Sequence, residues 1–137
     1  MSDKMRVLFV CAKNDVRSVL AEALLRHTDS SNFEAFSAGL EPGEIDPRTL
    51  ESLEHIGIET NGLRSKSINE FEGQQFHHVI TLCDKSSEEA SRMPSSDEVI
   101  VWSFEDPTTS EKHEPVRHAL QEIHDRMKMF VTVKTRQ

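Results

Sequence analysis

The segment from Cys11 to Ser18 combines a nucleophile with the parts of an anion-binding loop. Cys11 stands at the end of an apolar run, and five residues separate it from Arg17, where a helical pattern begins. Backbone N–H groups of a loop that leads into a helix N-terminus bind oxyanions and favour a thiolate over a thiol. The guanidinium of Arg17 offers a planar fork of donors that matches a tetrahedral anion. We therefore predict a thiol nucleophile that faces a bound oxyanion.

The loop residues between the nucleophile and the helix are candidates for binding this anion together with Ser18. They are Ala12, Lys13, Asn14, Asp15 and Val16. Several of these side chains also have an ordinary structural interpretation. Cys11 is alternatively a small buried hydrophobic residue, and Arg17 a surface arginine. Asn14 is either a turn residue that tolerates a positive φ or a side chain that holds the loop in shape. Ser18 is a helix cap, a hydrogen-bond donor to the Cys11 thiolate, or both.

Asp15 argues against an anion site, because it places a carboxylate in the loop. At about 6 Å and an effective dielectric constant near 20, two like charges repel by roughly 3 kcal/mol. We therefore expect the Asp15 side chain to point outward and the backbone amides to face the anion. Lys13 would offset part of the negative charge.

Two further reactive side chains follow apolar runs later in the chain. Cys83 comes directly after residues 79–82, and Asp106 comes just after residues 99–104. If the runs are parallel strands, their carboxyl ends lie at the edge of the sheet where ligands bind. Asp106 is then a candidate general acid that protonates a leaving oxygen, and Cys83 a candidate for thiol exchange with Cys11. The alternatives are an Asp-Pro turn and a core thiol.

The elements that must position these residues alternate along the chain. The expected strands are 6–10, 33–37, 77–82 and 98–104. The expected helices are 17–27, one that begins at Asp46-Pro47 and stops at Gly57, 86–92, and a long final helix from about 115. This alternation predicts an α/β fold with a parallel sheet that is covered on both faces. No internal repeat or long linker divides the chain, so residues 1–137 are expected to form a single domain.

The net charge, the lack of targeting segments and the cysteine content exclude some classes of function and indicate where the protein is located. The formal net charge is −8, which argues against general binding to nucleic acid or to an acidic membrane. The chain shows neither a secretory signal nor a membrane span, so we expect a cytoplasmic protein with reduced thiols. The two cysteines and seven histidines have no zinc spacing, and we expect neither a metal nor a bound cofactor.

These motifs resemble the low-molecular-weight tyrosine phosphatase superfamily, and more closely its arsenate reductase branch. The similar segments are 11–18, 21–23, 37–39, 46–47, 57–58 and 64–66, with 79–84 and 102–107 resembling the reductase branch in particular. The resemblance extends from about residue 6 to residue 130. It implies a three-layer sandwich in which a four-stranded parallel sheet has helices on both faces, with the phosphate loop after the first strand.

The resemblance also implies a role for each candidate residue. The implied nucleophile is Cys11, the oxyanion clamp Arg17, the loop supports Asn14 and Ser18, the general acid Asp106 and the resolving thiol Cys83. In the reductase branch the nucleophile attacks arsenate, and the resolving thiol then attacks Cys11. This second step releases arsenite and leaves a Cys11–Cys83 disulfide. An external thiol such as thioredoxin, glutaredoxin or glutathione is the implied reductant.

The chain departs from the family at three places. Thioredoxin-coupled members carry a third cysteine seven residues after the second, where this chain has Ala90. Either an external thiol resolves the intermediate directly, or reduction has been lost. Asp15 and Val16 stand where the family usually has small residues or cysteine. Thr108 and Thr109 replace the tyrosine pair of many phosphatases, which argues against an aromatic wall for phosphotyrosine.

Two alternative functions therefore stand beside an arsenate reductase. The first is a phosphatase that hydrolyses phosphotyrosine or other aryl phosphates through a Cys11 phosphocysteine intermediate, with Asp106 as general acid. The second is a non-catalytic domain that senses an anion or binds a partner, which is suggested by Asp15 in the loop.

Overall fold

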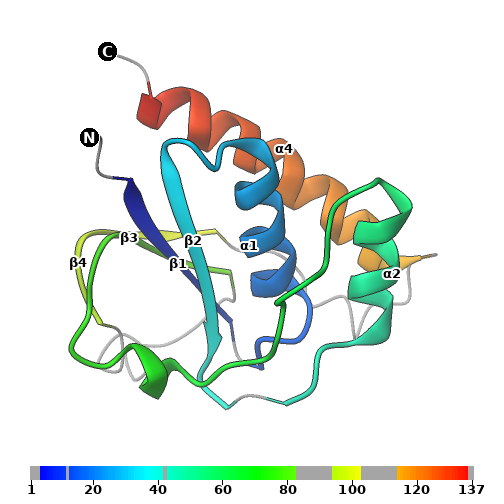
Figure 1. Cartoon of the computed structure of the whole chain (residues 1–137), viewed down its shortest axis with the longest axis horizontal. Helices are drawn as coiled ribbons and strands as arrows, with labels where there is room; N and C mark the ends of the chain where they lie inside the picture. The colour runs from blue at the N-terminus through cyan, green and yellow to red at the C-terminus, as the bar shows by residue number, and fades with distance from the viewer. Residues whose placement is uncertain (1–3, 12, 42, 83–93, 103–113, 136–137) are drawn as a thin grey trace.

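A parallel β-sheet forms the centre of the computed structural model, which describes residues 4–11, 13–41, 43–82, 94–102 and 114–135 (Figure 1). The elements in chain order are β1 (Met5–Cys11), α1 (Arg17–Thr28), β2 (Phe33–Gly39), α2 (Pro47–His55), the 3-10 helix η1 (Ile68–Phe71), β3 (Gln75–Thr81), β4 (Ser95–Val101) and α4 (Pro115–Thr135). The strand order is β2-β1-β3-β4, and all neighbouring strands are parallel. The predicted α/β fold with a four-stranded parallel sheet is confirmed.

The predicted strands are all present, but β3 and β4 begin earlier than predicted, each at a polar residue. The strand predicted at 77–82 is β3, which begins at Gln75, and the strand predicted at 98–104 is β4, which begins at Ser95. Gln75 pairs with Ser95 and Phe76 with Ser96. Backbone pairing needs no apolar side chain, so Gln75, Ser95 and Ser96 join the sheet without an apolar signal in the sequence.

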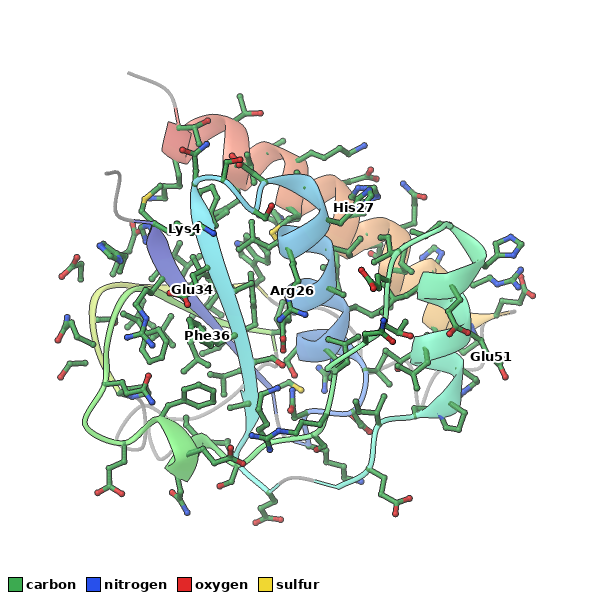
Figure 2. All side chains as sticks on the ribbon, in the orientation of Figure 1. Lys4, Arg26, His27, Glu34, Phe36 and Glu51 are labelled. Carbon is green, nitrogen blue, oxygen red and sulfur yellow. The ribbon has the colours of Figure 1, made fainter. Side chains whose placement is uncertain are left out.

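Alternating residues of β1 belong to two separate cores. Val7 and Phe9 pack with α1, α2 and α4 on one face of the sheet, whereas Leu8 and Val10 pack with η1 on the other. Figure 1 shows the three long helices together on one side. In Figure 2, Phe36 on β2 lies on the side away from α1. A central parallel strand is buried on both faces for this reason.

The helix predicted at 86–92 lies outside the described residues.

The carboxyl ends of the strands meet at one edge of the sheet. Cys11 is the register partner of Gly39, and Val10 is the partner of Thr81. The N–H of Leu82 donates to the Val10 carbonyl at 2.8 Å, and the N–H of Trp102 donates to the Thr81 carbonyl at 2.8 Å. Cys11 therefore lies at the edge where β2 and β3 also end.

Helix α2 begins as its sequence predicts. Asp46 is the N-cap residue, its side chain accepts from the Arg48 N–H at 2.9 Å, and Pro47 takes the first helical position. Gly57 follows the C-cap with φ +79°, a conformation that glycine adopts without a steric penalty. In the described part of the chain, no helix is long and apolar enough to cross a membrane.

Candidate active site

The sulfur of Cys11 is buried and receives polar contacts from the segment that follows it. Cys11 is 0% exposed. Its Sγ lies 2.9 Å from the Ser18 hydroxyl and accepts from the Asn14 N–H at 3.3 Å. Ser18 lies in the first turn of α1, whose N-cap is Val16. The interpretation of Ser18 as a helix cap is therefore wrong, and its hydroxyl instead contacts the sulfur.

A chain of hydrogen bonds decides the direction of the contact between Ser18 and Cys11. The Asn14 Oδ1 accepts from the Lys66 N–H at 2.7 Å, so the amide group of Asn14 directs its Nδ2 to the Ser18 Oγ, also at 2.7 Å. An amide nitrogen only donates, and a serine hydroxyl has a single proton. Because Ser18 accepts from Asn14, its own proton is available to the Cys11 sulfur. Two donors thus face the sulfur, and donors stabilise a thiolate relative to a thiol.

The loop backbone is held from outside through its carbonyl groups. The Cys11 carbonyl accepts from the Leu40 N–H at 3.2 Å. The Lys13 carbonyl accepts from the Gly43 N–H at 3.1 Å and from the Ser65 hydroxyl at 3.2 Å. The Asp15 carbonyl accepts from the Asp46 N–H at 3.2 Å and from the Thr49 hydroxyl at 2.9 Å. In a trans peptide the C=O of one residue and the N–H of the next point in opposite directions. The outward carbonyls of Lys13 and Asp15 therefore turn the N–H groups of Asn14 and Val16 inward.

Asn14 combines both of the properties considered for it. Its φ of +55° places it in the left-handed region, which asparagine tolerates better than most residues. Its side chain bridges Lys66 and Ser18, so it also holds the loop in shape.

Gly39, at the end of β2, packs directly against the loop backbone. A Cβ at this position would lie 2.7 Å from the Lys13 carbonyl carbon and 2.8 Å from the Asn14 nitrogen. Neither backbone atom can move without displacing the loop. Glycine at this position is therefore a requirement of the loop.

We predict that Gly39→Ala destabilises the protein by about 1–3 kcal/mol, the usual cost of overpacking, and weakens oxyanion binding. Denaturant unfolding and phosphate titration measure the two effects. Gly43→Ala is a matched control, because a Cβ there meets no atom within 4 Å. Equal stability of the two variants would contradict the prediction.

Arg17 lies at the same edge of the sheet as Cys11. It is 7% exposed, and its Nη1 donates to the Leu82 carbonyl at 3.2 Å. Leu82 follows β3 directly, so the guanidinium belongs to the edge where β1 and β3 end. The interpretation of Arg17 as a surface arginine is therefore wrong.

The structure describes only some of the remaining predicted site residues. Lys13 is exposed and Asp15 is partly exposed; the outward direction of the Asp15 side chain stays a prediction. Asp46, which holds the Asp15 carbonyl, has its pKa lowered chiefly by a hydrogen bond from the Arg48 side chain. Ala12, Cys83 and Asp106 lie outside the described residues.

A second group of buried polar side chains behind the loop was not predicted. Glu22 on α1 accepts from the Ser37 hydroxyl, from Arg26 at 2.5 Å and from the Lys66 ammonium at 3.3 Å. Its position between Ala21 and Ala23 in an apolar helix was the available signal, since a carboxylate on a buried face requires partners.

Comparison with known proteins places the chain among proteins of one family. The sequence profile of the low molecular weight phosphotyrosine protein phosphatases matches residues 6–135. An arsenate reductase of Halalkalibacterium halodurans is 29% identical over 133 residues, which cover 93% of this chain and 96% of that protein.

Two solved structures of arsenate reductases are also similar. An arsenate reductase in the phosphate-binding state is 25% identical with a TM-score of 0.82, covering 93% of this chain and 97% of that one. A thioredoxin-dependent arsenate reductase of Corynebacterium glutamicum is 27% identical with a TM-score of 0.72. The likeness to it covers 96% of this chain and 62% of that protein.

Proposed function

Because the chain belongs to the low molecular weight phosphotyrosine protein phosphatase family, as its motifs predicted, and because its relatives include arsenate reductases, we propose that it is an arsenate reductase with Cys11 as nucleophile. The observation that carries the proposal is the Cys11 sulfur, which has the Ser18 hydroxyl and the Asn14 N–H as donors. Relatives named arsenate reductase match it over nearly its full length, which favours this function over the phosphatase alternative.

The substrate is an oxyanion held by the loop that follows β1. The inward N–H group of Val16 binds an oxygen of the anion, and the α1 N-terminus adds its positive field. The Arg17 guanidinium clamps two further oxygens. Ala12, Lys13, Asp15 and Ser18 complete the loop around the substrate.

The reaction proceeds in two steps at sulfur. The Cys11 thiolate forms a bond to the arsenic of arsenate, and a hydroxyl group leaves as water after protonation by Asp106. The Cys83 thiolate then attacks Cys11 Sγ and breaks the bond between sulfur and arsenic. Arsenic keeps this electron pair and leaves as arsenite, while the two sulfurs are oxidised to a disulfide.

An external thiol returns the enzyme to its reduced form. The relative from Corynebacterium glutamicum is thioredoxin-dependent, and this chain has Ala90 where a third cysteine would relay the disulfide. We therefore propose that thioredoxin, glutaredoxin or glutathione reduces the Cys11–Cys83 bond directly. This chemistry suits a single-domain protein of the reducing cytoplasm, with no bound metal or cofactor and with no nucleic acid or membrane as partner.

The decisive experiment is to mix the reduced protein with arsenate, block the free thiols and map the cysteines by mass spectrometry. We expect a Cys11–Cys83 disulfide and one equivalent of arsenite. Protein incubated with phosphate instead is the control, since phosphate has the same shape and cannot accept the electrons. Two free thiols and no arsenite after exposure to arsenate would rule out the reductase.

Two observations favour the phosphatase alternative: the match to the phosphotyrosine phosphatase family, and Ala90 at the position of the third cysteine. This alternative predicts hydrolysis of aryl phosphates that is lost in Asp106→Ala and kept in Cys83→Ser.

A further inference from the structure

A buried ion pair lies behind the loop and takes no part in the proposed chemistry. Glu22 on α1 and Lys66, which precedes η1, have side chains that are 5% and 10% exposed. Their Oε1 and Nζ atoms are 3.3 Å apart, and the ammonium also donates to the Arg64 carbonyl at 3.0 Å. Ser37 and Arg26 donate to the same carboxylate; Figure 2 labels Arg26 on α1. A buried ion pair often adds little to the stability of a protein, so stability alone does not explain why this pair is present.

The backbone of Lys66 contacts the loop directly. Its N–H donates to the Asn14 Oδ1 at 2.7 Å, and its carbonyl accepts from the Gly39 N–H at 2.8 Å. The neighbouring Ser65 hydroxyl donates to the Lys13 carbonyl at 3.2 Å. A shift of Lys66 would therefore move the side chain of Asn14.

These contacts form a closed ring that touches the sulfur at Ser18 and Asn14. Ser18 and Glu22 are four residues apart on α1, on one face of the helix. Glu22 binds the Lys66 ammonium, the Lys66 N–H binds Asn14, and Asn14 donates back to the Ser18 hydroxyl. The ring holds the Asn14 amide in the one orientation that leaves the Ser18 proton for Cys11.

We propose that Glu22 and Lys66 are positioning residues that favour ionisation of Cys11 through Asn14 and Ser18. The inference rests on the proposed function, because it assigns to the pair the preparation of the nucleophile. Without the ammonium, the segment around Lys66 loses its attachment to α1. The Lys66 N–H then holds the Asn14 amide less firmly, and the direction of the hydrogen bond from Ser18 is less well fixed.

The test is the pH dependence of Cys11 alkylation by iodoacetamide in the full chain, read by mass spectrometry of the peptide that contains Cys11. We expect Lys66→Met and Glu22→Gln to slow alkylation about three- to tenfold near pH 6 but not near pH 10, because only the fraction of thiolate changes. Lys66→Arg should recover most of the rate. Lys128→Met is the control, since Lys128 forms an exposed pair with Asp125 at 3.5 Å on α4.

Profiles of folded Lys66→Met and Glu22→Gln that coincide with that of the native protein would overturn the inference. If both variants fail to fold, Ser37→Ala decides, because it removes only one hydrogen bond to Glu22. A smaller shift in the same direction supports the inference, and an unchanged profile overturns it. A native profile of an ordinary thiol, with its midpoint about pH 8.5, would instead refute the proposed function and the inference with it.

Discussion

Replacing Cys11 by serine is expected to abolish arsenite release, with a loss of at least about 10⁴-fold. A serine hydroxyl is a much weaker nucleophile than a thiolate, so we expect no bond to arsenic to form. The variant also lacks one of the two sulfurs that supply the electrons. Arsenite formation with thioredoxin and with glutathione, measured over many turnovers, tests this expectation.

The Cys11→Ser variant must be shown to fold, so that its loss of activity can be assigned to the missing nucleophile. Cys11 is fully buried at the end of β1, and serine is slightly smaller and more polar. The loop is held by its carbonyls and by Asn14 rather than by the sulfur. We therefore expect retained phosphate binding and a cooperative unfolding transition. Activity within about tenfold of the native protein would exclude Cys11 as the nucleophile.

Replacing Cys83 by serine should stop multiple turnover, with a fall of at least about 100-fold in arsenite release. The first step still proceeds, because it needs the loop, Cys11 and Asp106, and the substitution removes none of them. Arsenic then remains bonded to Cys11, since no neighbouring sulfur displaces it. Mass spectrometry of the intact variant should detect this adduct, and steady-state kinetics should show the loss.

Phosphate binding provides the control for this second variant. Cys83 follows Leu82, whose carbonyl accepts from Arg17, so a serine at 83 leaves that contact in place. We expect the affinity for phosphate to match that of the native protein. Sustained arsenite release by Cys83→Ser with an external thiol would contradict a resolving role for Cys83.

The order of strands and helices could be predicted from the sequence because each element has a local signal. Apolar runs identified four strands, and Asp46-Pro47 identified the start of α2. The bounds of β3 and β4 were missed, because polar residues enter the sheet through backbone pairing that only the neighbouring strand provides. The predicted roles of Cys83 and Asp106 stay predictions.

The candidate site also has a part that the sequence could predict and a part that it could not. Cys11, Asn14, Arg17 and Ser18 lie within eight residues, and a short loop between a strand and a helix must bring them together. Glu22 and Lys66 are 44 residues apart, and Asn14 and Lys66 are 52 apart. No spacing rule links such positions, so their contacts could not be predicted.

The sequence by itself predicted a thiol nucleophile, and it determined the length of the loop that follows Cys11 and the parallel sheet at whose edge this loop lies. Only the tertiary structure decided which way the hydrogen bonds run. The direction of the bond between Ser18 and Cys11 depends on Asn14, and the orientation of Asn14 depends on an N–H from Lys66. A hydroxyl can donate or accept, so its direction is set by remote partners that the fold alone brings into contact.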